Sequence, residues 1–176
     1  MTRIAKSVPK FIHGKVRLAI CILFLLWPGM VVLAQAQAHP DFSGIWKQDN
    51  ERSQPKRKSD ATLRLEHHDP VLTVETTIER GAQGSRHALQ KYTTGGKVSI
   101  STGADGDEFH TSIVWKDESL VFSIEEHEDG RILLSRETWT LLENGAVLER
   151  VREPLDTPAV GTRKQTLIYL RQSPQS

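Results

Sequence analysis

Residues 41–47 read Asp-Phe-Ser-Gly-Ile-Trp-Lys, and this stretch predicts the first β-strand of the fold. It carries a Gly-x-Trp core, Gly44 and Trp46, and nine further strand-like stretches follow it along the chain. Most of them are separated by short turns. Parallel strands need crossover connections of a dozen or more residues, so these short links favour antiparallel pairing. We therefore expect an all-β protein.

The later stretches are marked by alternating apolar residues or by β-branched residues, which suit a pleated surface. They are 62–67, 71–79, 86–93, 97–101, 109–116, 120–124, 131–142, 146–152 and 163–171. Glycine-containing pairs predict tight hairpin turns at 94–97, at Asp129-Gly130 and at Asn144-Gly145. The polar stretch 48–60 predicts a surface loop.

A sheet of this many strands has two exposed edges unless it closes on itself. We therefore expect a single antiparallel up-and-down β-barrel of about 8–10 strands, an architecture that removes both edges. A barrel of this size has room for one small ligand among its inward side chains. A two-sheet β-sandwich is the alternative.

Residues 1–38 have the features of a signal peptide. A basic segment without acidic residues precedes an apolar stretch, 18–33, and the Ala-rich end offers cleavage after Ala36 or after Ala38. An uncleaved membrane anchor is the alternative, but a spanning helix needs roughly 20 apolar residues. We expect a periplasmic or secreted barrel domain at 39–172, a polar tail at 173–176, and no stable membrane anchor after cleavage.

Charge and cysteine content exclude several classes of function. All five charges of the leader are basic, so the rest of the chain has 18 Lys and Arg against 22 Asp and Glu, a net charge of −4. We expect no nucleic-acid partner, because nucleic acids select basic surfaces. The single cysteine, Cys21, lies in the leader, which leaves the exported domain without disulfides or thiol nucleophiles.

The chain resembles the lipocalin-like (calycin) superfamily, which includes the fatty-acid-binding proteins. The resemblance spans residues 41–172 and is carried by Phe42-x-Gly44-x-Trp46-Lys47, by 137–145, and by the closing stretch 166–171. The chain looks especially like small exported bacterial proteins of unknown function that begin in this way. Two features depart from the fatty-acid-binding branch. Residues 48–60 are too short for its two helices, and Leu167 stands where that branch has the arginine of an Arg-x-Tyr pair.

The resemblance also implies a structural role at one end of the barrel. The Trp of the first strand closes that end and an Arg near the last strand packs over it. Trp46, Gly44 and Arg171 match these positions, with Arg163 as the other candidate arginine. A guanidinium can stack on an indole face and bond carbonyls there.

We expect an apolar or amphipathic small molecule to bind inside the barrel. Trp115, Phe122 and Trp139 are predicted to supply contact area, Arg136 a charge for a polar head, and Thr138 a second polar contact. Apolar pockets with a few polar groups are typical of such sites.

No catalytic, metal or cofactor site is predicted. The sequence lacks a Gly-x-Ser-x-Gly elbow, a P-loop and a dinucleotide fingerprint. The acidic stretch 125–129 predicts a solvated turn, with a weak divalent-cation site as the alternative. Cleavage after Ala36 would leave His39 as the third residue of the chain, where its imidazole and the free amino terminus could chelate copper or nickel. We favour an accidental position of His39 over a functional metal site.

These observations predict an exported carrier or sensor that is not an enzyme. Two alternatives remain: a cell-envelope interaction protein with a filled barrel, and an enzyme built on a calycin barrel, which would bury ionisable groups with shifted pKa values.

Overall fold

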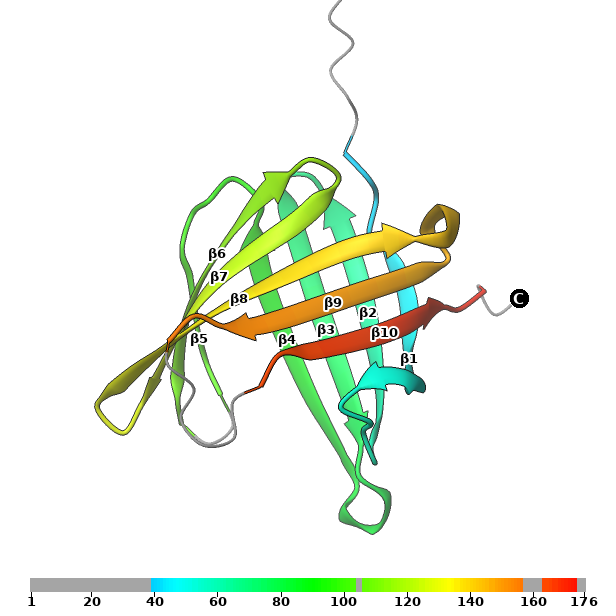
Figure 1. Cartoon of the computed structure of the whole chain (residues 1–176), viewed down its shortest axis with the longest axis horizontal. Helices are drawn as coiled ribbons and strands as arrows, with labels where there is room; N and C mark the ends of the chain where they lie inside the picture. The colour runs from blue at the N-terminus through cyan, green and yellow to red at the C-terminus, as the bar shows by residue number, and fades with distance from the viewer. Residues whose placement is uncertain (1–38, 104–105, 157–162, 174–176) are drawn as a thin grey trace, which may run out of the picture. The chain divides into compact units, whose positions relative to one another are not determined.

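The structure is a computed structural model that describes residues 39–103, 106–156 and 163–173. The predicted signal peptide and the end of the predicted tail therefore lie outside the described residues. Ten strands form the fold (Figure 1). They are β1 (Gly44–Gln54), β2 (Asp60–His68), β3 (Val71–Glu79), β4 (Ser85–Thr93), β5 (Ser99–Thr102), β6 (Glu108–Lys116), β7 (Ser119–Glu128), β8 (Arg131–Leu142), β9 (Val147–Pro154) and β10 (Gln165–Arg171). Two short 3₁₀ turns, Gly81–Gln83 and Glu143–Gly145, are the helical elements among the described residues, and none of these residues form a helix of the length and hydropathy that a membrane span requires.

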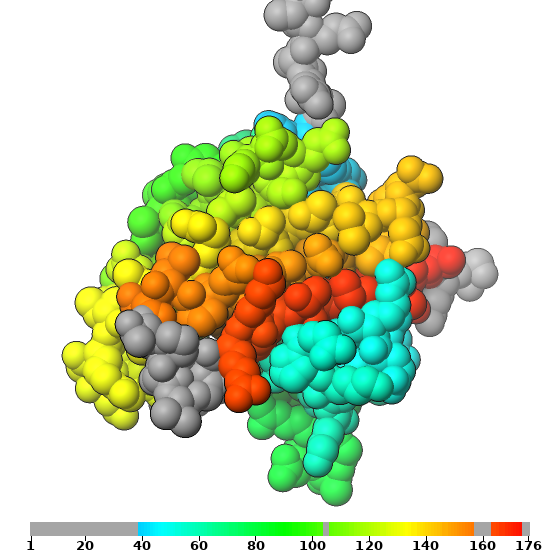
Figure 2. All heavy atoms as spheres, viewed as in Figure 1, coloured from blue at the N-terminus to red at the C-terminus, as the bar shows by residue number. Residues whose placement is uncertain are grey.

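The strands form one antiparallel sheet in which chain neighbours pair throughout, except between β4 and β5. Its order is β4-β3-β2-β1-β10-β9-β8-β7-β6-β5, so the first and last strands pair in its middle. The space-filling view shows β10, in red, packed directly against the cyan part of β1 (Figure 2). This arrangement confirms the predicted all-β, up-and-down barrel.

β4 and β5 do not form a hairpin with each other, so the predicted tight turn at 94–97 is wrong. Among the described residues β4 pairs with β3 and β5 with β6, and a single isolated bridge after β4 joins the two edges of the sheet. Gly95 instead bridges to Val114, and the amide of Gly96 donates to the carbonyl of Ile113 at 2.8 Å. The glycines cross from one edge strand to the other, and the φ of +81° at Gly96 is a conformation that glycine adopts without strain.

β1 is longer than predicted and takes up half of the expected 48–60 loop. Its pairing with β10 shifts register between Asp49 and Gln54. Ser53, fully buried there, donates to the carbonyl of Asp49 at 2.6 Å and accepts from the amide of Ile168 at 3.0 Å. The hydroxyl of Ser53 thus takes the place of backbone hydrogen bonds between β1 and β10 at the register shift. This explains how β1 continues through a polar sequence.

Inward-facing side chains change from apolar to polar along the strands. At one end Phe42, Trp46, Leu63, Ile113 and Leu120 are fully buried. Farther along, two strands bring charged residues inward: β9 runs from Leu148 to Arg150 to Arg152, and β8 from Leu141 to Trp139 to Glu137. The barrel therefore has one packed end and, beyond it, an interior lined by both apolar and charged side chains.

Candidate functional site

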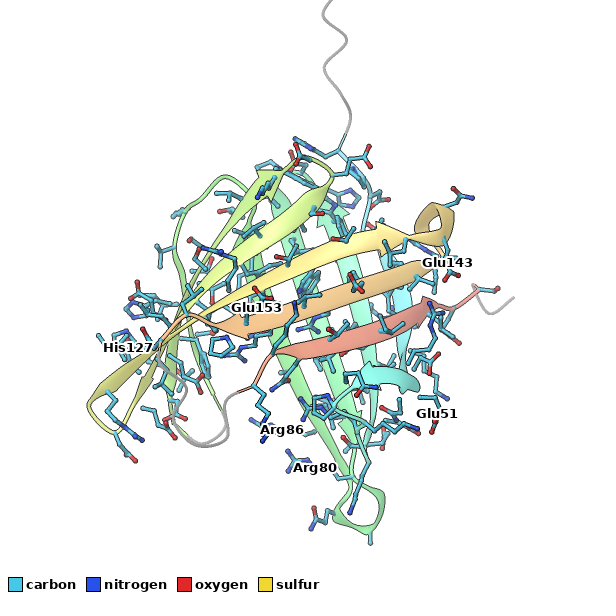
Figure 3. The ribbon with its side chains drawn as sticks, viewed as in Figure 1. Glu51, Arg80, Arg86, His127, Glu143 and Glu153 are labelled. Atoms are coloured by element: carbon cyan, nitrogen blue, oxygen red, sulfur yellow. The ribbon has the colours of Figure 1, made fainter. Side chains whose placement is uncertain are left out.

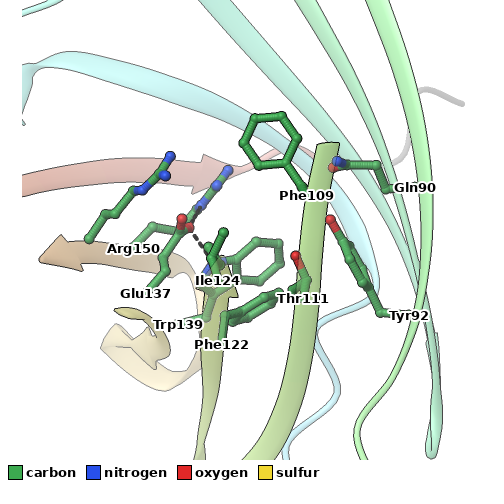
Figure 4. Close-up of a pocket in the computed structure, with 10 residues that line it drawn as sticks. Gln90, Tyr92, Phe109, Thr111, Phe122, Ile124, Glu137, Trp139 and Arg150 are labelled. Carbon is green, nitrogen blue, oxygen red and sulfur yellow. Dashed lines mark hydrogen bonds and ion pairs between the residues drawn. The ribbon is translucent and has the colours of Figure 1, made fainter. Parts of the chain in front are cut away.

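A cavity of about 160 Å³ lies in the lumen next to the packed end (Figure 4). Its wall comes from β4, β6, β7, β8 and β9, each contributing alternate residues, as the period of two in a strand requires. The lining residues are Gln90, Tyr92, Phe109, Thr111, Phe122, Ile124, Glu137, Trp139, Arg150 and Arg152.

Three aromatic rings form one side of the cavity. Tyr92 meets Phe122 edge to face with ring centroids 6.0 Å apart, and Phe122 lies 4.7 Å from Trp139. Such pairs add to the stabilisation that burial of the rings provides. The three rings give a rigid apolar surface from three different strands.

A buried ion pair lies beside these rings in the cavity wall. The guanidinium Nε of Arg150 donates to Oε1 of Glu137 at 2.6 Å, and the indole N–H of Trp139 donates to the same oxygen at 2.6 Å. The guanidinium carbon also lies 4.6 Å from the ring centroid of Trp139 and 5.6 Å from that of Tyr169. Side-chain exposure is 8% for Glu137 and 19% for Arg150, so the pair is held away from water.

Burial and the pairing act in opposite directions on these groups. Burial alone would raise the pKa of Glu137, but the charge and hydrogen bonds of Arg150 outweigh it, and the pKa lies below its ordinary value. Burial alone would lower the pKa of Arg150, and the carboxylate of Glu137 instead raises it. Burial raises the pKa of Tyr92 to about 12. Near neutral pH the pair is therefore charged and the phenol neutral.

Arg152 is the more accessible guanidinium of the lumen. Its Nε donates to the hydroxyl of Ser135 at 3.2 Å, and its Nη2 lies 3.2 Å from a carboxylate oxygen of Glu126. The side chain of Arg152 is 38% exposed and that of Glu126 is 24% exposed. A charged group thus stands at the border between cavity and solvent.

The predicted contact residues have different places in the structure. Phe122 and Trp139 line the cavity. Trp115 lies at the packed end instead, where it stacks on His39 at 4.1 Å and donates its indole N–H to Asp69 at 2.9 Å. It lies outside the cavity wall, because Thr111 and Ile113 separate it from Phe109 along the inward face of β6.

The predicted polar contacts, Arg136 and Thr138, are wrong as lumen residues. They pair with Ser123 and Val121 on the outer face of β7 and β8. The physical reason is alternation: each is a sequence neighbour of Trp139 or Glu137, which point inward, so both must point outward.

At the packed end, Arg171 covers the indole of Trp46. Its guanidinium carbon lies 4.2 Å from the ring centroid, its Nε donates to the carbonyl of Gly145 at 2.7 Å, and its Nη1 donates to the carbonyl of Ser43. A Cβ added at Gly44 would lie 2.8 Å from Nη1, and the φ of +139° there disfavours other residues. The alternative arginine, Arg163, is exposed ahead of β10.

Sequence reasoning missed the two residues at the centre of the site, Glu137 and Arg150. The signal that could have found them is alternation. Taking Trp139 as inward makes Glu137 inward as well, and a charged residue at an inward position demands a partner. The register places Arg150 directly opposite Trp139.

Comparisons with known proteins place the fold. No family model matches the chain, and no curated protein matches it. Solved structures do. The REP1-NXSQ fatty acid transporter superposes with a TM-score of 0.57 at 12% identity, over 77% of this chain and 98% of that one. Secretory abundant heat soluble protein 4 from Ramazzottius varieornatus gives 0.58 at 12% identity, over 78% and 99%. A Schistosoma mansoni fatty acid binding protein in complex with arachidonic acid gives 0.54 at 13% identity, over 75% and 96%.

These likenesses show that the chain folds into the same kind of β-barrel as these solved structures, the fold that the resemblance in the sequence implied. At such low identity they carry the fold alone. The finer resemblance, to small exported bacterial proteins, stays a prediction.

Proposed function

We propose that the protein is an exported carrier or sensor that binds a small amphipathic anion in its lumen. The observation that carries this proposal is the cavity itself, with both aromatic rings and arginines in its wall. Ligand sites of this kind combine an apolar wall with a few placed polar groups. The same fold in the REP1-NXSQ transporter and the Schistosoma protein, which are named for fatty acids, supports an apolar acid as ligand.

The volume of the cavity limits the ligand. Pockets for drug-sized molecules measure roughly 300–1,000 Å³, whereas a cavity of about 150 Å³ accepts a single benzene ring. At about 160 Å³ the lumen matches a ring-sized group and not a whole long-chain fatty acid. The ligand class we propose is therefore a small aromatic or short-chain acid.

Arg152 is the residue we assign to the acidic head. Arg150 already satisfies Glu137 and is held between two aromatic rings, so a ligand would have to break a buried pair to reach it. Arg152 is more exposed, and its contact with Glu126 is longer. A ligand carboxylate can take the place of Glu126 and form the bidentate pair that a guanidinium favours.

The cavity supports binding over the two alternatives. A filled barrel was expected for an interaction protein, and the lumen here is partly empty. An enzyme would need an acid or base that titrates near neutral pH. The pKa of Glu137 moves down, that of Arg150 moves up, and that of Tyr92 rises to about 12, so each moves away from neutrality.

NMR of the ¹⁵N-labelled protein, purified from cells that express the full chain, tests the proposal. Benzoate is the probe and benzamide its neutral control of the same size. We expect saturable shifts of the Trp139 indole N–H, which donates to Glu137 at the cavity wall, and no shift of the Trp46 indole at the packed end. The variant W139F assigns the signal.

Two substitutions separate the head-group contact from general effects. We expect R152Q to weaken benzoate binding by about tenfold, the scale of one charged hydrogen bond, and to leave benzamide unchanged. R136Q, on the outer face, is the matched control and should bind like the parent. Equal loss in R136Q and R152Q, or shifts at Trp46 as large as at Trp139, would overturn the proposal.

A further inference from the structure

Two histidines and two glutamates gather on the outer face of β6 and β7, away from the lumen. Glu108 and His110 lie on β6, Glu125 and His127 on β7, and the register pairs His110 with Glu125 and Glu108 with His127. Directly opposite residues of an antiparallel pair have Cβ atoms about 4.5–5.5 Å apart. The four side chains therefore form a two-by-two patch (Figure 3 shows His127 at the periphery of the barrel).

The ligand atoms of this patch already converge. One nitrogen or oxygen from each of His110, Glu125 and His127 lies within 4.8 Å of the other two. The two imidazole rings lie diagonally across the patch, with centroids 4.5 Å apart and planes tilted by 31°. A tetrahedral Zn²⁺ site with bonds of about 2.0–2.1 Å places its ligand atoms roughly 3.3 Å apart, so small side-chain rotations complete the set.

Glu108 fixes the proton of one ring. Its carboxylate lies 2.6 Å from Nε2 of His110, and since an ionised carboxylate only accepts, Nε2 carries the hydrogen. When the ring is neutral with this tautomer, Nδ1 holds the lone pair that a metal ion would bind. A carboxylate behind the second ring nitrogen is the usual support of a metal-bound histidine.

One ring nitrogen of His127 lacks a hydrogen-bond partner among the described residues. Its Nε2 is buried and has no hydrogen-bond partner within the part of the chain that the structure describes, and the nearest carboxylate oxygen, from Glu125, is 3.9 Å away. A buried polar atom without a partner is costly. A cation shared with Glu125 would satisfy it.

The expected acidic turn at 125–129 is thus split between two sides of the sheet. Glu126 points into the lumen toward Arg152, while Glu125 and His127 point outward. The cluster that forms comes from two strands and contains imidazoles, which Ca²⁺ and Mg²⁺ do not favour.

We propose that His110, His127 and Glu125 bind a divalent transition-metal ion, with Zn²⁺ as the fitting species and Glu108 as the outer carboxylate that orients His110. Two imidazoles and one carboxylate are a ligand set that Zn²⁺ accepts, with water in the fourth position. Because Zn²⁺ bonds only to neutral imidazole, binding weakens as pH falls.

Calorimetry with ZnCl₂ tests the site, using untagged protein from cells that express the full chain. We expect one Zn²⁺ per chain near neutral pH and much weaker binding at about pH 5. Loss of an outer partner costs roughly 10–100-fold in metal affinity, so E108Q should lose about tenfold, while H110Q, H127Q and E125Q should each lose about 100-fold or more.

Two control variants make the result specific. H87Q removes an exposed outer-face histidine that bonds Thr77, and H39Q removes the histidine near the start of the exported domain. Both should bind Zn²⁺ like the parent. Loss of binding in H87Q or H39Q equal to that in H127Q, or no saturable binding by the parent, would overturn the proposal. Melting curves without metal show that each variant folds, and E125Q serves if a histidine variant does not.

Discussion

Glu137 and Arg150 form a salt bridge inside the barrel, with 2.6 Å between Oε1 and Nε, although they come from diagonal positions of β8 and β9. In the register Glu137 faces Arg152 and Trp139 faces Arg150. The long arginine side chain crosses the face of Trp139 to reach the carboxylate. This leaves Arg152 for Glu126 and Ser135, nearer to solvent, and so separates a structural arginine from an accessible one.

Removing one partner of this pair should destabilise the protein strongly. E137Q leaves the charge of Arg150 buried without compensation, and breaking a buried pair in this way costs about 3–5 kcal/mol. The free energy of unfolding in urea measures the loss. The double variant E137L/R150M should be less destabilised than E137Q, since no charge remains buried. E75Q, which removes an exposed partner of Arg64, is the control and should change little. A loss in E75Q as large as in E137Q would contradict the assignment.

His67 should make stability depend on pH. It lies at the packed end with 3% of its side chain exposed, and burial lowers its pKa from 6.5 despite the carboxylates of Asp41 and Asp69 at 3.8 and 3.9 Å. The unfolded chain then binds more protons than the folded one just below pH 6.5, so the stability contribution is complete above that pH and is lost as pH falls toward the folded pKa.

Urea unfolding at about pH 7.5 and about pH 5.5 measures this loss. H67Q should show a smaller difference between the two pH values than the parent. H68Q is the matched control, because His68 is an exposed neighbour on the other face of β2, and it should keep the full difference. An unchanged pH dependence in H67Q would assign the effect to another group.

Substitutions of Gly44 and of Arg171 should have non-additive effects on the free energy of unfolding. G44A forces a side chain into a backbone with φ of +139° and brings its Cβ within 2.8 Å of the guanidinium, so a loss of about 1–3 kcal/mol is expected. R171A removes the stacking on Trp46 and the bonds to carbonyls, at a similar cost of about 1–3 kcal/mol. The double variant should lose less than the sum, as measured by a double-mutant cycle, and strict additivity would show that the two do not interact.

Export should remove the leader. Mass spectrometry of the protein from the periplasm of a Gram-negative host is expected to give a chain that begins after Ala36 or after Ala38. The variant L25R/L26R should stay uncleaved, because two arginines interrupt the apolar core of the leader. An intact N-terminus in the parent would contradict the proposed location.

Much of the barrel could be predicted because the alternation of inward and outward side chains along a strand can be read from the local sequence. Phe109, Thr111 and Ile113 alternate in sequence and share one inward face in the structure. Asp129 and Gly130 form the expected turn with φ of +47° and +76°. At the next hairpin Asn144 and Gly145 also have positive φ, +54° and +83°, and the positive-φ run starts one residue earlier than predicted, with +51° at Glu143.

The rest depended on which strands meet, and that is not local. Gly95 and Gly96 allow the chain to turn, but the local sequence is the same whether the chain pairs back on the preceding strand or crosses to a distant one. Arg150 and Glu137 are each ordinary charged residues until the register brings them together. The four residues of the proposed zinc site likewise come together only through the pairing of β6 with β7, and each strand alone carries two of them.

The central claim, that the lumen binds a small amphipathic anion, is tested most directly by the indole N–H signals of Trp139 and Trp46 during titration with benzoate. Our account predicts a saturable shift at Trp139 that R152Q weakens by about tenfold while the Trp46 signal stays in place. A Trp139 signal that does not move at millimolar benzoate would contradict it.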